Sequence, residues 1–97
     1  MGVGKRIFAS GNEYVGEFKE GKKSGKGTME YNNKDFYNGE WDDDQMHGLG
    51  HYKWYTGDEY RGGFKNDKRH GKGTLILSNG EVYEATWEDG KMTNEPV

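Results

Sequence analysis

Residues 60–74 read Tyr-Arg-Gly-Gly-Phe-Lys-Asn-Asp-Lys-Arg-His-Gly-Lys-Gly-Thr, an aromatic-Gly-Gly-aromatic run followed by a polar turn and a glycine-rich run. Similar runs begin at Tyr14, Tyr37 and Tyr83, so successive copies start 23 residues apart. Self-similarity at a fixed period in this range is typical of a repeat array, in which each copy is one small structural unit. This period therefore decides the predicted fold.

The composition limits the class of protein. Of 97 residues, 30% are hydrophobic and 32% are charged, which on its own is typical of disorder. Aromatic residues, however, reach 14% and the 17 glycines recur at fixed positions, so we expect a folded chain with a thin core. The net charge of −3 provides no overall field that would attract nucleic acid. Without cysteine, there is no disulfide framework and no thiol chemistry.

No apolar run is long enough to span a bilayer, and the N-terminus lacks the apolar core of a signal peptide. We therefore predict an intracellular, cytoplasmic chain. Whether it is cytoskeletal, ciliary or membrane-associated is left open by the sequence.

Each unit is predicted to form a β-hairpin. Alternation along residues 14–18 places Tyr14, Gly16 and Phe18 on one face, and residues 25–31 alternate in the same way. No stretch has the apolar spacing of an amphipathic helix. The sequence thus predicts an all-β fold with no helix of note, an elongated single-layer array of about eight short antiparallel strands, because a lone hairpin is marginal in water.

The array is predicted to occupy residues 2–92, followed by a tail at 93–97. It opens in mid-unit, because Gly2 and Gly4 stand one period before Gly25 and Gly27. Strands with open edges invite pairing with another chain, so a homo-oligomer formed through the sheet edges is one expectation. The predicted divisions are a half unit (2–13), three units (14–36, 37–59 and 60–82) and a partial unit (83–92).

Glycines inside the predicted strands need an explanation. Each weakens a strand, and together they would cost on the order of 5–9 kcal/mol. We expect neighbouring aromatic rings to lie across the bare glycine backbone, where a Cβ atom would lift the ring away. The glycines in question are Gly16, Gly25, Gly27, Gly39, Gly48, Gly50, Gly62, Gly71 and Gly73.

Two recurring motifs carry a resemblance to a known family. One is Tyr-x-Gly-x-aromatic, as in residues 37–41, and the other is the glycine-rich turn, as in His70-Gly71-Lys72-Gly73. Their recurrence over nearly the whole chain resembles the MORN (membrane occupation and recognition nexus) repeat family. Local departures are Asp44 and Asp67 in place of the turn glycine, Ser24 in place of His and Ala85 in place of Gly.

The resemblance implies stacked hairpins that form a curved groove, and a binding or scaffolding role without catalysis. Members of the family serve as assembly platforms in cilia, cytoskeletal structures and membrane junctions. Others are modules attached to lipid kinases or SET-domain methyltransferases. Phosphoinositide binding and capture of partner peptides in the groove are both proposed for the family.

Eight aromatic side chains are the candidates for partner binding. Their main role is expected to be holding the array together, but one side of a single-layer sheet can remain open, and exposed aromatic strips are typical binding surfaces. The candidates are Tyr14, Phe18, Tyr37, Trp41, Tyr60, Phe64, Tyr83 and Trp87.

Basic residues in the turns are the candidates for lipid binding. They recur in matching turns two periods apart, although acidic residues close by in sequence would weaken their field. These residues are Lys22, Lys23, Lys26, Lys68, Arg69 and Lys72.

Other chemistries have weaker support. The fragment at residues 25–28 resembles the end of a phosphate-binding loop but lacks the full spacing. His47 and His70 occupy matching positions a repeat apart, so a shared metal ion is not expected. The run of aspartates at 42–44 lacks the remainder of a calcium loop. We predict no metal, no cofactor, no nucleic acid and no catalytic residue.

These observations favour a non-catalytic module that captures a peptide or helix of a protein partner in an aromatic- and glycine-lined groove, and that self-associates. One alternative is phosphoinositide-dependent recruitment to membranes through the Lys/Arg-rich turns. Another is that the chain is the regulatory repeat segment of a larger enzyme, a lipid kinase or a SET-domain methyltransferase.

Overall fold

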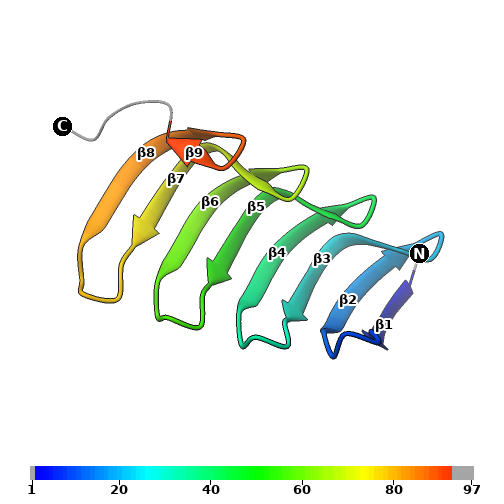
Figure 1. Ribbon diagram of the computed structural model, residues 1–97. Helices are drawn as coiled ribbons and strands as arrows, with labels where there is room; N and C mark the ends of the chain where they lie inside the picture. The colour runs from blue at the N-terminus through cyan, green and yellow to red at the C-terminus, as the bar shows by residue number, and fades with distance from the viewer. Residues whose placement is uncertain (1, 93–97) are drawn as a thin grey trace.

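The computed structural model describes residues 2–92, and the predicted tail at 93–97 lies outside this part. Nine antiparallel strands form one open sheet in sequence order, which confirms the all-β, single-layer prediction and adds a short ninth strand (Figure 1). Within residues 2–92 there is no helix, and so none that could cross a membrane. The strands are β1 (Gly2–Ile7), β2 (Glu13–Lys19), β3 (Lys22–Glu30), β4 (Phe36–Asp42), β5 (Gln45–Lys53), β6 (Glu59–Lys65), β7 (Lys68–Ile76), β8 (Val82–Glu88) and β9 (Lys91–Met92).

The sheet is elongated, with principal extents of 43 × 23 × 17 Å. Successive hairpins lie side by side along its length, with β1 and β9 at opposite ends (Figure 1). The pairing of β1 with β2 repeats that of β3 with β4, since Gly4 lies opposite Gly16 as Gly27 lies opposite Gly39. The same register therefore continues from the first strand.

Tight turns join consecutive strands at one end of the hairpins. Both central residues of each turn have left-handed backbone angles, which is the type I′ geometry that matches the twist of a hairpin. Asp44 (φ 69°) and Asp67 (φ 67°) hold the position that Gly21 and Gly90 occupy in the first and last tight turns. The Asp44 carboxylate accepts a hydrogen bond from the Lys23 amide at 2.8 Å, and the Asp67 carboxylate accepts one from the Met46 amide at 2.7 Å. The backbone amide of this turn residue also donates to the preceding hairpin, as Gly90 does to the Arg69 carbonyl at 3.1 Å, so the aspartates add a second, side-chain bond that glycine lacks.

Wider turns join consecutive strands at the opposite end, and side-chain hydrogen bonds connect these turns to one another as well. Asp35 accepts a hydrogen bond from the Tyr55 amide, and Asp58 accepts one from the Ser78 amide, both at 2.8 Å. Each bond connects one turn to the next along the array. The turns at both ends of the strands are therefore stabilised by hydrogen bonds between consecutive units.

The tyrosines at the start of each unit explain one group of glycines. A Cβ atom on Gly50 would lie 2.2–2.5 Å from the ring and hydroxyl of Tyr37, and Gly27 and Gly73 stand in the same relation to Tyr14 and Tyr60. Each hydroxyl reaches past the glycine to donate a hydrogen bond to a backbone carbonyl, as Tyr37 does to Glu40 at 3.0 Å. The expectation of rings lying over bare backbone is confirmed for these glycines.

A second group of glycines has two causes. At Gly16, Gly39 and Gly62 a Cβ atom would collide with the backbone of the paired strand and would also lie 2.5–2.9 Å from the tyrosine hydroxyl. The prediction that rings cover all of the glycines is wrong for Gly25, Gly48 and Gly71, where no ring atom is among the nearest neighbours. At Gly25 the cause is a bulge: Gly16 pairs with Gly27 and Phe18 with Lys23, so β3 has extra residues there. Gly25 has φ +77° in this bulge, a conformation that favours glycine.

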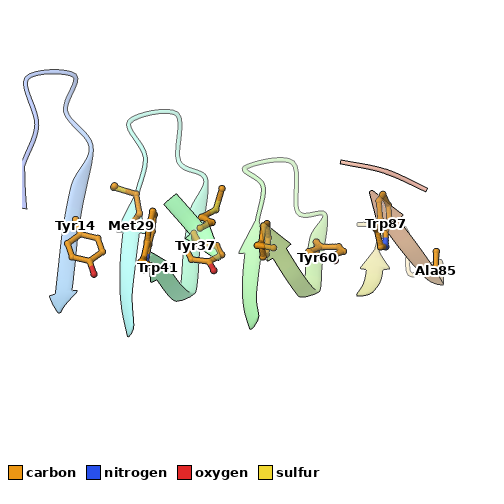
Figure 2. Close-up of a cluster of buried hydrophobic side chains, with 9 residues drawn as sticks. Tyr14, Met29, Tyr37, Trp41, Tyr60, Ala85 and Trp87 are labelled. Atoms are coloured by element: carbon orange, nitrogen blue, oxygen red, sulfur yellow. The ribbon is translucent and has the colours of Figure 1, made fainter. Parts of the chain in front are cut away.

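The core is a row of buried side chains along one face of the sheet (Figure 2). Its aromatic rings meet edge to face, which is a favoured geometry for aromatic pairs. Each fully buried tyrosine lies between an aromatic ring of its own unit and one of the next. Tyr37, for example, contacts Trp41 and Phe64 with ring centroids 5.1 Å apart in both pairs. The row runs through Phe18, Tyr14, Trp41, Tyr37, Phe64, Tyr60 and Trp87. We call the side of the sheet that bears this row the aromatic face.

Candidate binding face

Most of the aromatic residues predicted to bind a partner lie inside the core. Tyr14, Tyr37 and Tyr60 have no exposed surface, and Trp41, Phe64 and Trp87 are also buried. Phe18 and Tyr83 are half-buried. Seven of these rings therefore form the ring row, and Tyr83 lies outside it with its hydroxyl on Glu81. Surface for a partner must come chiefly from side chains that lie beside the row.

A second set of rings provides that surface. Phe8, Tyr31, Tyr52 and Trp54 are half-buried and pack against the core without being enclosed by it. The Tyr52 ring contacts Tyr31 and Trp54, at 5.9 and 4.9 Å between centroids. Sequence analysis did not single out these residues, although Phe8, Tyr31 and Trp54 recur at the 23-residue period just before the wide turns. That recurrence was the available signal.

These rings line two adjoining hollows on the aromatic face, which together we call the groove. The Trp54 hollow, of about 300 Å³, also contains Tyr52, Phe64 and Arg69. The Tyr31 hollow, of about 270 Å³, contains Phe8, Lys23, Trp41 and Asp44. Met46 and Asp67 line both hollows, so the groove is continuous across neighbouring hairpins.

Two cations of the groove lie on aromatic rings. The Lys23 ammonium is 4.6 Å from the centre of the Trp41 ring, and the Arg69 guanidinium is 4.4 Å from that of Trp87. Partial burial lowers the pKa of Lys23, although nearby Asp44 and Asp67 oppose the effect. Both cations therefore contribute to packing as well as to charge.

Tyr31 and Asp35 show how polar groups are accommodated at the edge of the groove. Burial raises the pKa of Tyr31 to about 12, and the charges of Asp67 and Asp35 act in the same direction. Asp35 is 6% exposed, and its carboxylate accepts hydrogen bonds from the Tyr52 hydroxyl and the Tyr55 amide, both at 2.8 Å. Its charge is therefore stabilised by donors that belong to the next unit.

The basic residues predicted to bind lipid divide between the two faces of the sheet. Lys23 and Arg69 pair with the aromatic positions Phe18 and Phe64, so they belong to the aromatic face. Alternation places Lys22, Lys26, Lys68 and Lys72 on the opposite face, where all four are exposed. Lys68, at the tight turn, also lines the Trp54 hollow. Lys22 forms an ion pair with Asp43 at 2.8 Å.

The histidines do not gather into a metal site. His47 and His70 are exposed, and His51 lies 2.6 Å from the Glu59 carboxylate. Among residues 2–92, no group of three or more His, Cys, Asp or Glu side chains is placed to hold a metal ion. The aspartates at 42–44 form the end of β4 and a tight turn.

Comparison with known proteins gives one result on the family. The MORN repeat model matches residues 14–36, 37–59 and 60–82 as three consecutive repeats. No curated protein matches the chain in sequence. The match covers more than half of the chain, and it agrees with a sheet of stacked hairpins. The chain is therefore a member of the MORN repeat family.

Proposed function

We propose that the chain is a non-catalytic binding module whose groove captures a segment of a partner protein. MORN repeats in general bind proteins or membranes, and the repeat itself is a non-catalytic module. The observation that supports our proposal most is the groove, a continuous strip of partly exposed rings across neighbouring units.

The chemistry of the groove favours a protein segment over a small molecule. Both hollows are shallow, and their volumes lie at or just below the lower end of typical small-molecule sites. Half-exposed Trp and Tyr rings surrounded by charged groups are instead the composition of protein interfaces. A segment with apolar side chains would cover Tyr52 and Trp54 and leave the charged margin in water.

The alternative of recruitment to phosphoinositide membranes has less support from the geometry. Lys22 and Lys68 lie on one face but are separated by four strand spacings, about 19 Å, which is too far for one headgroup. Gln45 stands at the matching position between them. The field of Lys22 is further reduced by its ion pair with Asp43.

Selection from a displayed library of random 12-residue peptides tests the proposal. The wild-type chain should enrich peptides, and Trp54→Ser should reduce binding of those peptides at least tenfold, because it removes a ring that lines the groove. Leu49→Ser is the matched control, since Leu49 is 68% exposed on the opposite face. Circular dichroism establishes that each variant is folded. Failure to enrich any peptide, or equal losses in both variants, would contradict groove binding.

A further inference from the structure

One position of the repeat carries a cation in two units and a neutral side chain in the unit between them. Lys23, Met46 and Arg69 occupy the matching position at the start of β3, β5 and β7, each 23 residues from the next. All three lie on the aromatic face, since they pair with Phe18, Trp41 and Phe64.

The two cations have equivalent ring environments. Each lies within 6.0 Å of three ring centres, and the rings come from matching positions of the repeat. For Lys23 the rings are Phe8, Tyr14 and Trp41; for Arg69 they are Trp54, Tyr60 and Trp87.

The middle unit keeps the rings but lacks the cation. The matching rings are Tyr31, Tyr37 and Phe64, and the residue at the cation's position is Met46. Met46 has no charge, and its flexible thioether can adjust to a neighbouring group. Met46 is itself buried, as are Tyr37 and Phe64, so Tyr31 is the ring of this set that stays partly exposed. The middle of the groove therefore has no cation of its own at this position and presents the Tyr31 ring beside Met46.

The charge of the Tyr31 hollow points to the same ligand. Its lining has one amine, Lys23, and two carboxylates, Asp44 and Asp67. Within the described residues, neither carboxylate has a basic partner within ion-pair distance. One oxygen of each accepts a backbone amide, which leaves the other for a further donor. Negative charge from Asp67 also acts on Tyr31, where it contributes to the raised pKa of the phenol.

We propose that the Tyr31 hollow binds a basic side chain, Lys or Arg, of the partner segment, with its stem against Met46 and its charge at Asp67 and Asp44. This inference rests on the proposed function of the groove. It specifies the partner as a segment in which a basic residue is flanked by apolar residues. The apolar residues would cover the Trp54 hollow. The partner's cation would thus lie beside the Tyr31 ring and the two carboxylates, and not over the buried rings of Tyr37 and Phe64.

Two substitutions test the inference without removing the groove. Asp67→Asn removes the charge and keeps an oxygen that can accept the Met46 amide, and Asn tolerates the left-handed turn position. Asp43→Asn is the matched control, because Asp43 is in a tight turn but forms its ion pair with Lys22 of the opposite face. Met46→Lys places a cation inside the middle unit, where it should exclude one from the partner.

The experiment uses two displayed peptide libraries, random except for a central residue fixed as Lys in one and as Met in the other. With the wild-type chain and with Asp43→Asn, the Lys library should yield at least tenfold more binders than the Met library. With Asp67→Asn and Met46→Lys, the ratio should fall to about one. Thermal melting establishes that the variants are folded; if Met46→Lys is not, the comparison of Asp67→Asn with Asp43→Asn decides.

The outcomes separate the inference from the function on which it rests. Equal enrichment of both libraries by the wild-type chain would overturn the proposal that the Tyr31 hollow binds a basic side chain, and would leave groove binding intact. Enrichment of the Lys library that survives Asp67→Asn would also overturn it, because the charge would then be recognised elsewhere. Enrichment of neither library would contradict the proposed function, and the inference with it.

Discussion

Replacing Gly50 with alanine should destabilise the sheet, because the new Cβ atom would take the space in which the Tyr37 ring packs. The new Cβ atom would lie 2.5 Å from two carbons of the Tyr37 ring and 2.2 Å from its hydroxyl oxygen. The ring cannot easily swing away, because Trp41 and Phe64 contact it from both sides at 5.1 Å between centroids. Gly50→Ala must therefore move a whole section of the ring row.

The cost can be estimated from its parts. Overpacking a core typically costs about 1–3 kcal/mol. Displacing the Tyr37 hydroxyl from the Glu40 carbonyl costs about 1 kcal/mol more, and weakened ring contacts about 0.5–1.5 kcal/mol. Alanine recovers about 0.5–1 kcal/mol, because glycine is the poorer strand residue. The net loss in the free energy of unfolding should be about 3 kcal/mol, or about 12–24 °C in Tm for a chain of this size.

Gly4 provides a matched control, because it occupies the same position of the repeat as Gly50 but has no tyrosine over it. Its Cβ atom would meet the Phe18 ring at 3.6 Å, an ordinary contact. Urea unfolding followed by tryptophan fluorescence should therefore show Gly4→Ala within about 0.5 kcal/mol of the wild type. If Gly50→Ala cost no more than Gly4→Ala, ring packing would not be the reason for glycine at this position.

Three further predictions concern a bond between units, a bond within a unit and a buried phenol. Asp58→Ala should cost about 1 kcal/mol and speed hydrogen exchange at the Ser78 amide, which loses its acceptor; unchanged exchange would argue against the bond. Glu40→Ala should do the same at the Leu49 amide and Glu40→Gln should not, because glutamine keeps an acceptor oxygen; equal effects would contradict this. Burial raises the pKa of Tyr14 from 10.0 to about 12, so urea midpoints should be steady below pH 10 and fall as the pH rises towards 12; midpoints that stay constant over this range would refute it.

Much of the fold follows from the 23-residue period. The recurrence of Tyr14, Tyr37 and Tyr60 sets the phase of the strands, and alternation then places aromatic residues and glycines on one face. The register is strongly specified because a slip by one residue would turn every ring towards solvent. The family resemblance pointed to the same arrangement, and the family match agrees with it.

The reasons why glycine or aspartate stands at particular positions could not be predicted from the sequence. Gly16 and Gly25 are both predicted on the same face by alternation, yet one faces a paired backbone and the other lies in a bulge. Asp44 and Asp67 looked like departures from the turn glycine, but their carboxylates bind amides of the preceding hairpin. Such contacts depend on how neighbouring hairpins stack, which local sequence patterns do not specify.

The candidate binding face was predicted in its location but not in its exposed members. Large rings at fixed positions indicated an aromatic face, but the sequence does not show which rings are buried and which stay exposed. The structure encloses Tyr37 and leaves Trp54 partly open. Exposure depends on the position along the strand, because residues next to the wide turns lie at the margin of the ring row.

The most direct test of groove binding is to map where a selected peptide contacts the chain by NMR. Binding should shift the Met46 methyl signal and the Trp54 indole N–H signal, because both side chains line the groove. The methyl signals of Leu49 and Val15, which are exposed on the opposite face, should stay in place. Shifts confined to Leu49 and Val15, with Met46 and Trp54 unchanged, would contradict the proposal that the groove is the binding surface.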